Sequence, residues 1–302
     1  MSQAEYRTTT RFIEVAHAIL EEQQPATIRQ LHYQLVGLDE KTKREIGGFS
    51  NTQQDYRRVS RLVTKARKDG RIPWEWIVDR SRPNYEWQAW DNLAEYLQST
   101  KDGYRKNYWA DQNVYIEIWN EKDATTGSLY ELLAEFGVVM RVGRGFQSST
   151  RVREIGELFN RIAKPRIVVF YLGDFDSSGM DIERDLRARV EEHTFRTFEV
   201  RRVAIFADDI KKFNLPPQRV KSEDPRADSF RKAHGRQCVE LDALPPVELR
   251  RRVRNAVESL IDKPAWRRAL SVEAVEFLSI QDFVSKWPLA KKSSKADTEA
   301  EQ

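Results

Sequence analysis

The spacing of apolar residues predicts three helices in the first eighty positions of the chain. Residues 8–22 carry apolar side chains at the three-to-four-residue interval of one helix face, and residues 28–36 repeat the pattern after Thr27, a residue type that caps helices. A third amphipathic segment covers residues 52–68 and ends before Gly70. We therefore expect a small helical bundle at the start of the chain.

The segments around these helices complete an expected motif. Residues 37–50 are polar and contain several glycines, so they are expected to be a loop. Residues 72–79, IPWEWIVD, contain aromatic and β-branched side chains and are expected to be a strand or wing. Three helices followed by a β element, with the last helix basic, indicate a winged helix-turn-helix in residues 1–80.

From residue 113 the pattern changes to short apolar runs that alternate with amphipathic helical segments. Strands are expected in residues 113–119, 138–142, 166–174 and 199–206. Helices are expected in residues 124–136, after Thr150, and in residues 177–194. This alternation implies a parallel sheet covered on both faces, and we expect an α/β, Rossmann-like second domain.

The pattern also predicts the domain organisation. A connecting helix or linker is expected in residues 81–112, the α/β domain with C-terminal helices in residues 113–288, and a disordered tail in residues 289–302. Inside the α/β domain, residues 213–236 are polar and proline-containing and are expected to be a loop. A helix that begins at a proline pair is expected in residues 245–261.

Composition excludes several classes of protein. The chain has 302 residues, of which 40% are apolar, and its Trp, Tyr and Phe content is too high for a disordered protein. No window approaches an apolar membrane span, and the first residues lack the apolar segment of a secretory signal, so we expect a cytoplasmic protein. The single cysteine, Cys238, excludes an intramolecular disulfide framework and is interpreted as a small buried hydrophobe.

Clustered cations suggest a surface that binds nucleic-acid phosphates. The net charge is only +4, but residues 56–71 carry seven Lys or Arg against one Asp. A second basic stretch lies in residues 250–254, and a glycine-containing loop carries Arg141 and Arg144. The alternatives are that the basic helix presents an ordinary solvated face and that the arginine-containing loop is a simple surface loop. The candidate DNA-binding residues are Arg57, Arg58, Arg61, Lys65, Lys68 and Arg144.

Carboxylates follow two of the predicted strands. Glu121 lies just past the first strand, and Asp174 and Asp176 lie just past the third. Ligands of open α/β sheets bind beyond the carboxyl ends of the strands, and several carboxylates suit Mg²⁺, for which Mn²⁺ can substitute. Gly173 and Gly179 bracket the aspartates and allow the backbone to turn and approach a phosphate. The alternatives are a helix cap or surface residue for Glu121 and an N-cap for the Asp-x-Asp turn.

Four segments together resemble one protein family. WNEKDA (119–124) and LGDFDSSGMDI (172–182) are similar to the glutamate and Asp-x-Asp motifs of the Toprim domain, in the form found in the topoisomerase VI A subunit and its meiotic double-strand-break relatives. TIRQLHYQLV (27–36) resembles a segment of that family's winged-helix (5Y-CAP) domain, and VELDALPP (239–246) a segment of its Toprim half. The best agreement is with compact orphan relatives called Mini-A and spans roughly residues 8–260.

The resemblance implies roles for individual residues. Tyr33 would attack the DNA phosphate and form a phosphotyrosyl link, with help from Arg29. It also implies a homodimer, in which the tyrosine of one protomer works with the metal site of the other. The remaining site candidates in the matched segments are the metal ligands Glu121, Asp174 and Asp176, together with Lys122, Asp181 and Glu240.

The chain departs from the family pattern at several positions. The first Tyr of the family's Tyr-Tyr pair is His32, and Ser177-Ser178 replaces a common Pro-Tyr after the second Asp. No ATPase motif is present, so the chain alone cannot couple ATP to strand passage. Tyr33 is expected to be either the nucleophile or a ring packed in the winged-helix core, since a phenol needs help from a cation or metal to react at neutral pH.

These observations predict a Mg²⁺-dependent, nucleoid-associated protein that binds double-stranded DNA and cleaves phosphodiesters at a Toprim metal site. Hydrolysis would need only the metal and a water, whereas transesterification would need Tyr33. The alternative is a non-catalytic DNA-binding module, or a subunit that depends on a separate ATPase partner. Clustered negative charge near phosphates argues against a pure binding role.

Overall fold

The computed structural model describes residues 3–78, 87–143, 148–219, 224 and 226–286. The chain divides into two compact units, residues 1–83 with 113–261 and residues 84–112 with 262–302. The tail expected in residues 289–302 lies outside the described residues. Among the described helices, none combines the length and the apolar character needed to cross a membrane.

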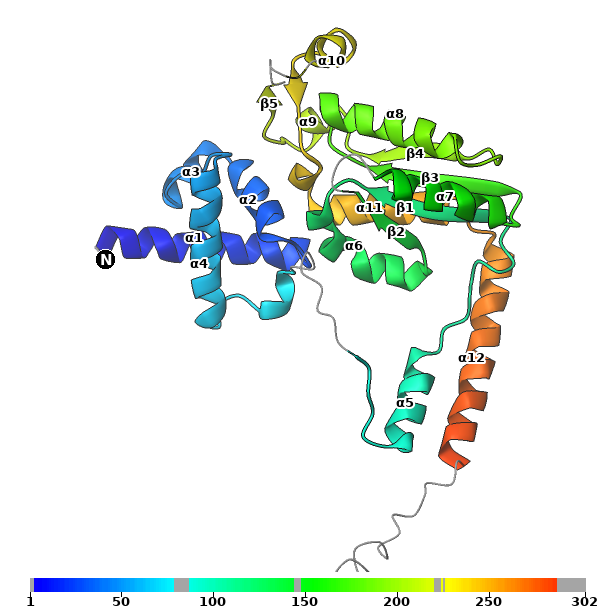
Figure 1. Ribbon diagram of the computed structural model, residues 1–302. Helices are drawn as coiled ribbons and strands as arrows, with labels where there is room; N and C mark the ends of the chain where they lie inside the picture. Colours follow the sequence, from blue (N-terminus) through cyan, green and yellow to red (C-terminus); the bar gives the residue numbers. More distant parts are fainter. Residues whose placement is uncertain (1–2, 79–86, 144–147, 220–223, 225, 287–302) are drawn as a thin grey trace, which may run out of the picture. The chain divides into compact units, whose positions relative to one another are not determined.

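The start of the first unit is a helical bundle (Figure 1). Its helices are α1 (Gln3–Gln23), α2 (Ile28–Val36), α3 (Glu40–Glu45) and α4 (Gln53–Lys68). Thr27 and Gln30 form a capping box that starts α2, as Thr27 was expected to do. Buried side chains of α1, α2 and α4, including Phe12, Leu31 and Val63, form one core. Three helices are therefore confirmed in nearly the predicted positions.

Two segments of this bundle differ from expectation. The loop expected in residues 37–50 contains the short helix α3, which starts because the Asp39 carboxylate accepts hydrogen bonds from the backbone N–H groups of Lys41 and Thr42. The expected wing at residues 72–79 is a 3₁₀ turn, Trp74–Trp76, followed by a single bridge between Ala26 and Ile77. Arg67 stabilises this turn, since its Nη2 donates to the Trp74 carbonyl at 2.6 Å.

The rest of the first unit is built on a four-stranded parallel sheet. Its order is β2 (Val139–Val142), β1 (Val114–Asn120), β3 (Arg166–Leu172) and β4 (Glu199–Ala204). The central strands β1 and β3 are buried on both faces, which explains their nearly continuous apolar sequences. The predicted α/β class with a parallel sheet is confirmed.

Helices cover both faces of this sheet (Figure 1). Helices α7 (Ser149–Arg161) and α8 (Ser177–Glu191) pack against each other and share a core with β1 and β3 that includes Trp119, Phe159 and Tyr171. Helix α6 (Asp123–Phe136) contacts α11 (Pro246–Glu258), and α11 contacts β4. Helix α7 is capped by Ser148 rather than by Thr150.

The polar segment after β4 contains more structure than expected. Residues 213–236 were predicted to be a loop, but they include β5 (Gln218–Arg219) and α10 (Ala227–His234). Strand β5 pairs antiparallel with β6 (Gln237–Cys238), and a 3₁₀ turn, η2 (Leu241–Ala243), follows. The short helix α9 (Asp209–Lys212) precedes this ribbon. Phe230 explains α10, because it anchors the helix by packing against Phe175.

The second unit contains α5 (Leu93–Gly103) and α12 (Lys263–Lys286). Helix α5 lies within the connecting region expected in residues 81–112, and it starts after its cap Asn92, because the Asn92 side chain accepts from the Glu95 N–H. Lys106 forms an ion pair with Glu276 of α12 at 3.0 Å, and the Tyr104 hydroxyl donates to the same carboxylate. The segment that follows α5 thus makes polar contacts with α12, while α5 itself packs against that helix.

Candidate functional site

Glu121 and Asp174 lie side by side because β1 and β3 are neighbouring parallel strands. The strands are paired up to Asn120 and Leu172, so their carboxyl ends are level. The Glu121 backbone N–H donates to the Leu172 carbonyl at 2.8 Å, and the Asp174 N–H donates to Glu121 Oε2 at 3.0 Å. The sheet therefore brings these predicted site residues together at one edge.

Asp176 also caps the N-terminus of α8. Its Oδ1 accepts from the Gly179 backbone N–H at 2.7 Å, which makes it the N-cap of the helix. The N-cap alternative for the Asp-x-Asp turn is thus correct for Asp176. Its charge still acts on Glu121: burial raises the pKa of Glu121 to about 7, and repulsion by Asp174 and Asp176 adds to the shift.

Lys122 joins these carboxylates to a second acidic segment. Its Nζ lies 3.0 Å from Asp174 Oδ2 and 2.9 Å from Glu240 Oε2. Burial opposes the charge on Lys122, but attraction by Asp174 and Glu240 raises its pKa above the ordinary value. Asp174 is also fixed by the Leu241 backbone N–H, which donates to Oδ1 at 2.8 Å. Lys122 and Glu240, both predicted candidates, therefore belong to the same cluster as Asp174.

Asp242 is a buried carboxylate of this cluster that was not among the predicted site residues. Its side chain is 1% exposed, and neither carboxylate oxygen has a hydrogen-bond partner among the described residues. Burial raises its pKa to about 6, against the opposing attraction of Lys122. The available sequence signal was its place in VELDALPP, two residues after Glu240. A buried carboxylate without partners is costly, so the cluster holds more negative charge than its own cations neutralise.

The donor chemistry of the cluster fits a hard divalent cation. Within the described ranges, no group of three or more His, Cys, Asp or Glu side chains is arranged as a ready set of metal ligands. The carboxylates nevertheless include the orphaned oxygens of Asp242 and the mutually repelling Glu121 and Asp174. A bound cation would relieve this repulsion, and carboxylate oxygens are the ligands that Mg²⁺ and Mn²⁺ prefer.

Tyr33 and Arg29 of α2 approach the same cluster within one chain. Arg29 Nη1 lies 3.9 Å from Glu240 Oε2, and its guanidinium stacks on the ring of Tyr56. The Tyr33 side chain is 2% exposed. Its pKa is raised by burial and further by Glu240, so the reactive phenolate is disfavoured. In this arrangement Tyr33 packs as a core residue with its hydroxyl facing the carboxylates.

Gly173 and Gly179 are needed for space around the carboxylates. A Cβ at Gly179 would lie 2.4 Å from the Asp174 carbonyl oxygen and 3.1 Å from Glu121 Oε2. A Cβ at Gly173 would lie 2.7 Å from the same glutamate oxygen. Both glycines thus permit Glu121 to approach the turn that carries Asp174.

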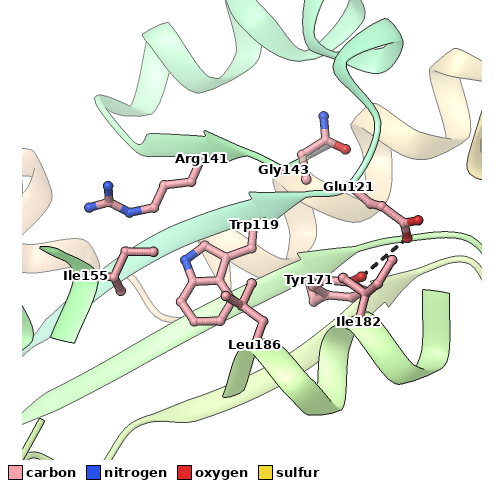
Figure 2. A pocket seen from close by; sticks show the side chains of 9 residues that line it. Trp119, Glu121, Arg141, Gly143, Ile155, Tyr171, Ile182 and Leu186 are labelled. Atoms are coloured by element: carbon pink, nitrogen blue, oxygen red, sulfur yellow. Dashed lines mark hydrogen bonds between the residues drawn. The ribbon is translucent and has the colours of Figure 1, made fainter. Parts of the chain in front are cut away.

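A small, mainly apolar pocket lies beside Glu121, as Figure 2 shows. Trp119, Ile155 and Leu186 line it, and the Tyr171 hydroxyl donates to Glu121 Oε2 at 3.3 Å. Arg141, which the sequence suggested as a phosphate contact, lines the pocket while forming two 2.7 Å bonds to a buried carboxylate, that of Glu117. Arg141 is therefore held within the sheet by Glu117 and does not contact DNA in this arrangement.

Helix α4 presents a row of exposed cations. Arg57, Arg61, Lys65 and Lys68 are exposed and recur at three-to-four-residue spacing, so they share one face. Within the part of the chain that the structure describes, these four have no acidic partner. Arg58 is different, because its Nη1 donates to the carbonyls of Gly47 and Gly48 at 3.0 and 3.1 Å.

The arginines of the second basic stretch, residues 250–254, form hydrogen bonds and ion pairs within the molecule. Arg250 donates to the carbonyls at the end of α1, among them Gln24 at 2.7 Å, where helix carbonyls lack partners of their own. Its neighbours form ion pairs: Arg251 with Glu248, Arg252 with Asp209, and Arg254 with Glu135. The phosphate-binding interpretation of residues 250–254 is therefore wrong for this arrangement.

Two further candidates stand apart from the cluster. The Asp181 carboxylate binds Arg184 at 2.7 Å and Arg226 at 3.0 Å, and these contacts lower its pKa. Asp181 thus tethers α8 to the segment before α10. Arg144 lies outside the described residues.

Comparisons with protein-family models, with curated proteins and with solved structures found no match for this chain. The motifs and the geometry of the cluster are therefore the basis for any statement about function.

Proposed function

We propose that this chain binds double-stranded DNA and cleaves its phosphodiesters in a reaction that depends on Mg²⁺ or Mn²⁺, as the resemblance to topoisomerase VI A-like Toprim proteins of the Mini-A type implies. The observation that carries the proposal is the convergence of Glu121 and Asp174 at the ends of neighbouring parallel strands, joined by a 3.0 Å hydrogen bond. A half-buried and a buried carboxylate that repel each other favour a cation between them.

Different residues of the chain would bind the cation, orient the carboxylates and hold the DNA. A divalent cation, when bound, would neutralise charge on the scissile phosphate and make a water more acidic. Glu121, Asp174 and Asp176 would bind that cation, while Lys122 orients Asp174 and Glu240 through its ion pairs. The row of cations on α4 would hold the DNA backbone through its phosphates.

The state of Tyr33 favours water over tyrosine as the attacking group. Tyr33 is buried, and its raised pKa reduces the share of phenolate. Transesterification remains a second candidate, because the hydroxyl already faces Glu240 at the edge of the cluster. In that case α2 would have to expose Tyr33 to DNA. The metal site that works with this tyrosine would come from the other protomer of a homodimer, or the reaction would depend on a separate ATPase partner.

Plasmid cleavage tests these proposals. Supercoiled DNA is incubated with Mg²⁺ or Mn²⁺ and wild-type protein, Asp174→Asn, Tyr33→Phe or the surface control Asp208→Asn, and protein-linked DNA is scored on denaturing gels. We expect the wild type, Tyr33→Phe and the control to cut and Asp174→Asn to be inactive. If Tyr33→Phe lost both DNA cutting and the covalent protein–DNA adduct that the wild type forms, transesterification would be established. A wild type that cuts nothing with either metal would favour the binding-module or partner-dependent alternative.

A further inference from the structure

The β5–β6 ribbon carries arginines that have no acidic partner among the described residues. Arginines elsewhere around the sheet are mostly neutralised by carboxylates, as in the pairs Arg187–Glu191 and Arg202–Glu183. Arg219 on β5 and Arg236 just before β6 are exposed and, among the described residues, have no ion pair. The ribbon therefore keeps an excess of positive charge.

These arginines face one hollow of the surface. Arg219, Arg236 and Arg231 line a hollow of about 620 Å³, together with Pro217, Gln218 and Gln237. Arg231 is paired with the exposed Asp228 at 3.0 Å, and no carboxylate is among the described residues that line the hollow. A basic hollow with neutral hydrogen-bonding groups suits an anionic backbone.

The hollow adjoins the carboxylate cluster. A smaller pocket of about 100 Å³ is lined by Asp176 and Glu240, and it shares two walls, Gln218 and Arg219, with the basic hollow. The Gln218 side chain also donates to Glu240 Oε1 at 3.1 Å. A chain of phosphates in the hollow would thus lead toward Asp176, one of the three predicted metal ligands.

We propose that the β5–β6 ribbon binds the sugar–phosphate backbone of the DNA strand that enters the candidate site, with Arg219 and Arg236 each contacting a phosphate. This inference rests on the proposed function and adds the position of the substrate. The α4 row would then hold a separate stretch of the duplex. Each phosphate contact that is lost should reduce the salt dependence of binding, by about 0.9 in the slope of log K against log salt for duplex DNA.

The test compares two double variants with the wild type. Arg219→Gln/Arg236→Gln removes the unpaired cations, whereas Arg184→Gln/Arg187→Gln removes arginines of α8 that are paired with carboxylates. Binding of a fluorescent duplex is measured by anisotropy in EDTA at several salt concentrations, and folding is checked by circular dichroism. We expect the ribbon variant to lose about 2 units of slope and at least about tenfold in affinity at low salt. The α8 control should keep the wild-type slope.

The outcomes separate this inference from the proposed function. An unchanged slope in the ribbon variant, or an equal loss in the α8 control, would overturn the ribbon inference while leaving cleavage untouched. A reduced slope in a protein that cuts no DNA with Mg²⁺ or Mn²⁺ would support the ribbon as a DNA contact and refute the cleavage proposal. A wild type that does not bind DNA would overturn both.

Discussion

Replacing Asp242 with asparagine should stabilise the metal-free protein at alkaline pH. The carboxylate is buried without a hydrogen-bond partner among the described residues, and its pKa is raised from 3.8 to about 6. A shift of about two units corresponds to roughly 3 kcal/mol of destabilisation when the group is ionised. At 1% exposure, solvent screens little of this effect.

The pH dependence distinguishes a charge effect from a packing effect. The folded state holds the Asp242 proton more tightly than the unfolded state, so the contribution of this group to stability falls as pH rises from about 4 to 6 and stays low above that. Asparagine does not titrate, and any penalty from its own buried amide is the same at every pH. The gain in unfolding free energy of Asp242→Asn over wild type should therefore be about 2 kcal/mol larger at pH 8 than at pH 4.

Urea unfolding followed by tryptophan fluorescence, in EDTA at both pH values, measures this difference. Asp208→Asn is the matched control, because Asp208 is exposed, and it should change stability by no more than about 0.5 kcal/mol at either pH. The reasoning would be refuted if Asp242→Asn changed stability equally at pH 4 and pH 8, or if it were the less stable protein only at pH 8. The first result would mean that Lys122 and Arg29 balance the cost of burying the Asp242 charge, and the second that they outweigh it.

Three further predictions concern the carboxylate cluster and α4, the helix proposed to contact DNA. Gly179→Ala should abolish cleavage and lower the unfolding free energy by about 1–3 kcal/mol, because the new Cβ would lie 2.4 Å from the Asp174 carbonyl oxygen; urea unfolding and plasmid cleavage measure the two effects. Tyr33→Phe should keep metal-dependent cleavage and change stability by about 1 kcal/mol or less, since Glu240 retains its bond to Lys122; a complete loss of cleavage in a folded variant would contradict this. Arg57→Gln/Arg61→Gln should weaken duplex binding and flatten its salt dependence, whereas an unchanged slope would exclude this face of α4 as a DNA contact.

Much of the sheet and its edge follows from local sequence. The runs of β1 and β3 are mostly apolar, and parallel pairing then forces the residues just past them, Glu121 and Asp174, to the same edge. These two positions were predictable because they depend on strand order alone.

Other features depend on contacts that no local pattern contains. The turn at Trp74–Trp76 is fixed by Arg67 from α4, and α10 is anchored by Phe230 against Phe175. The charges of residues 250–254 resemble a phosphate-binding patch in sequence, yet Arg252 and Arg254 are neutralised by distant carboxylates. Asp242 was missed for the same reason, since its burial arises only when η2 packs under α2.

The central claim is that the carboxylates at the ends of β1 and β3 bind a divalent cation, and Mn²⁺ binding followed by electron paramagnetic resonance tests it most directly. Asp174→Asn keeps an oxygen that can accept from the Leu241 N–H but loses the charge, and Asp208→Asn serves as the control. We predict that the wild type and the control bind Mn²⁺ and that Asp174→Asn binds it at least about tenfold more weakly. Equal Mn²⁺ binding by wild type and Asp174→Asn, or none by the wild type, would contradict the account.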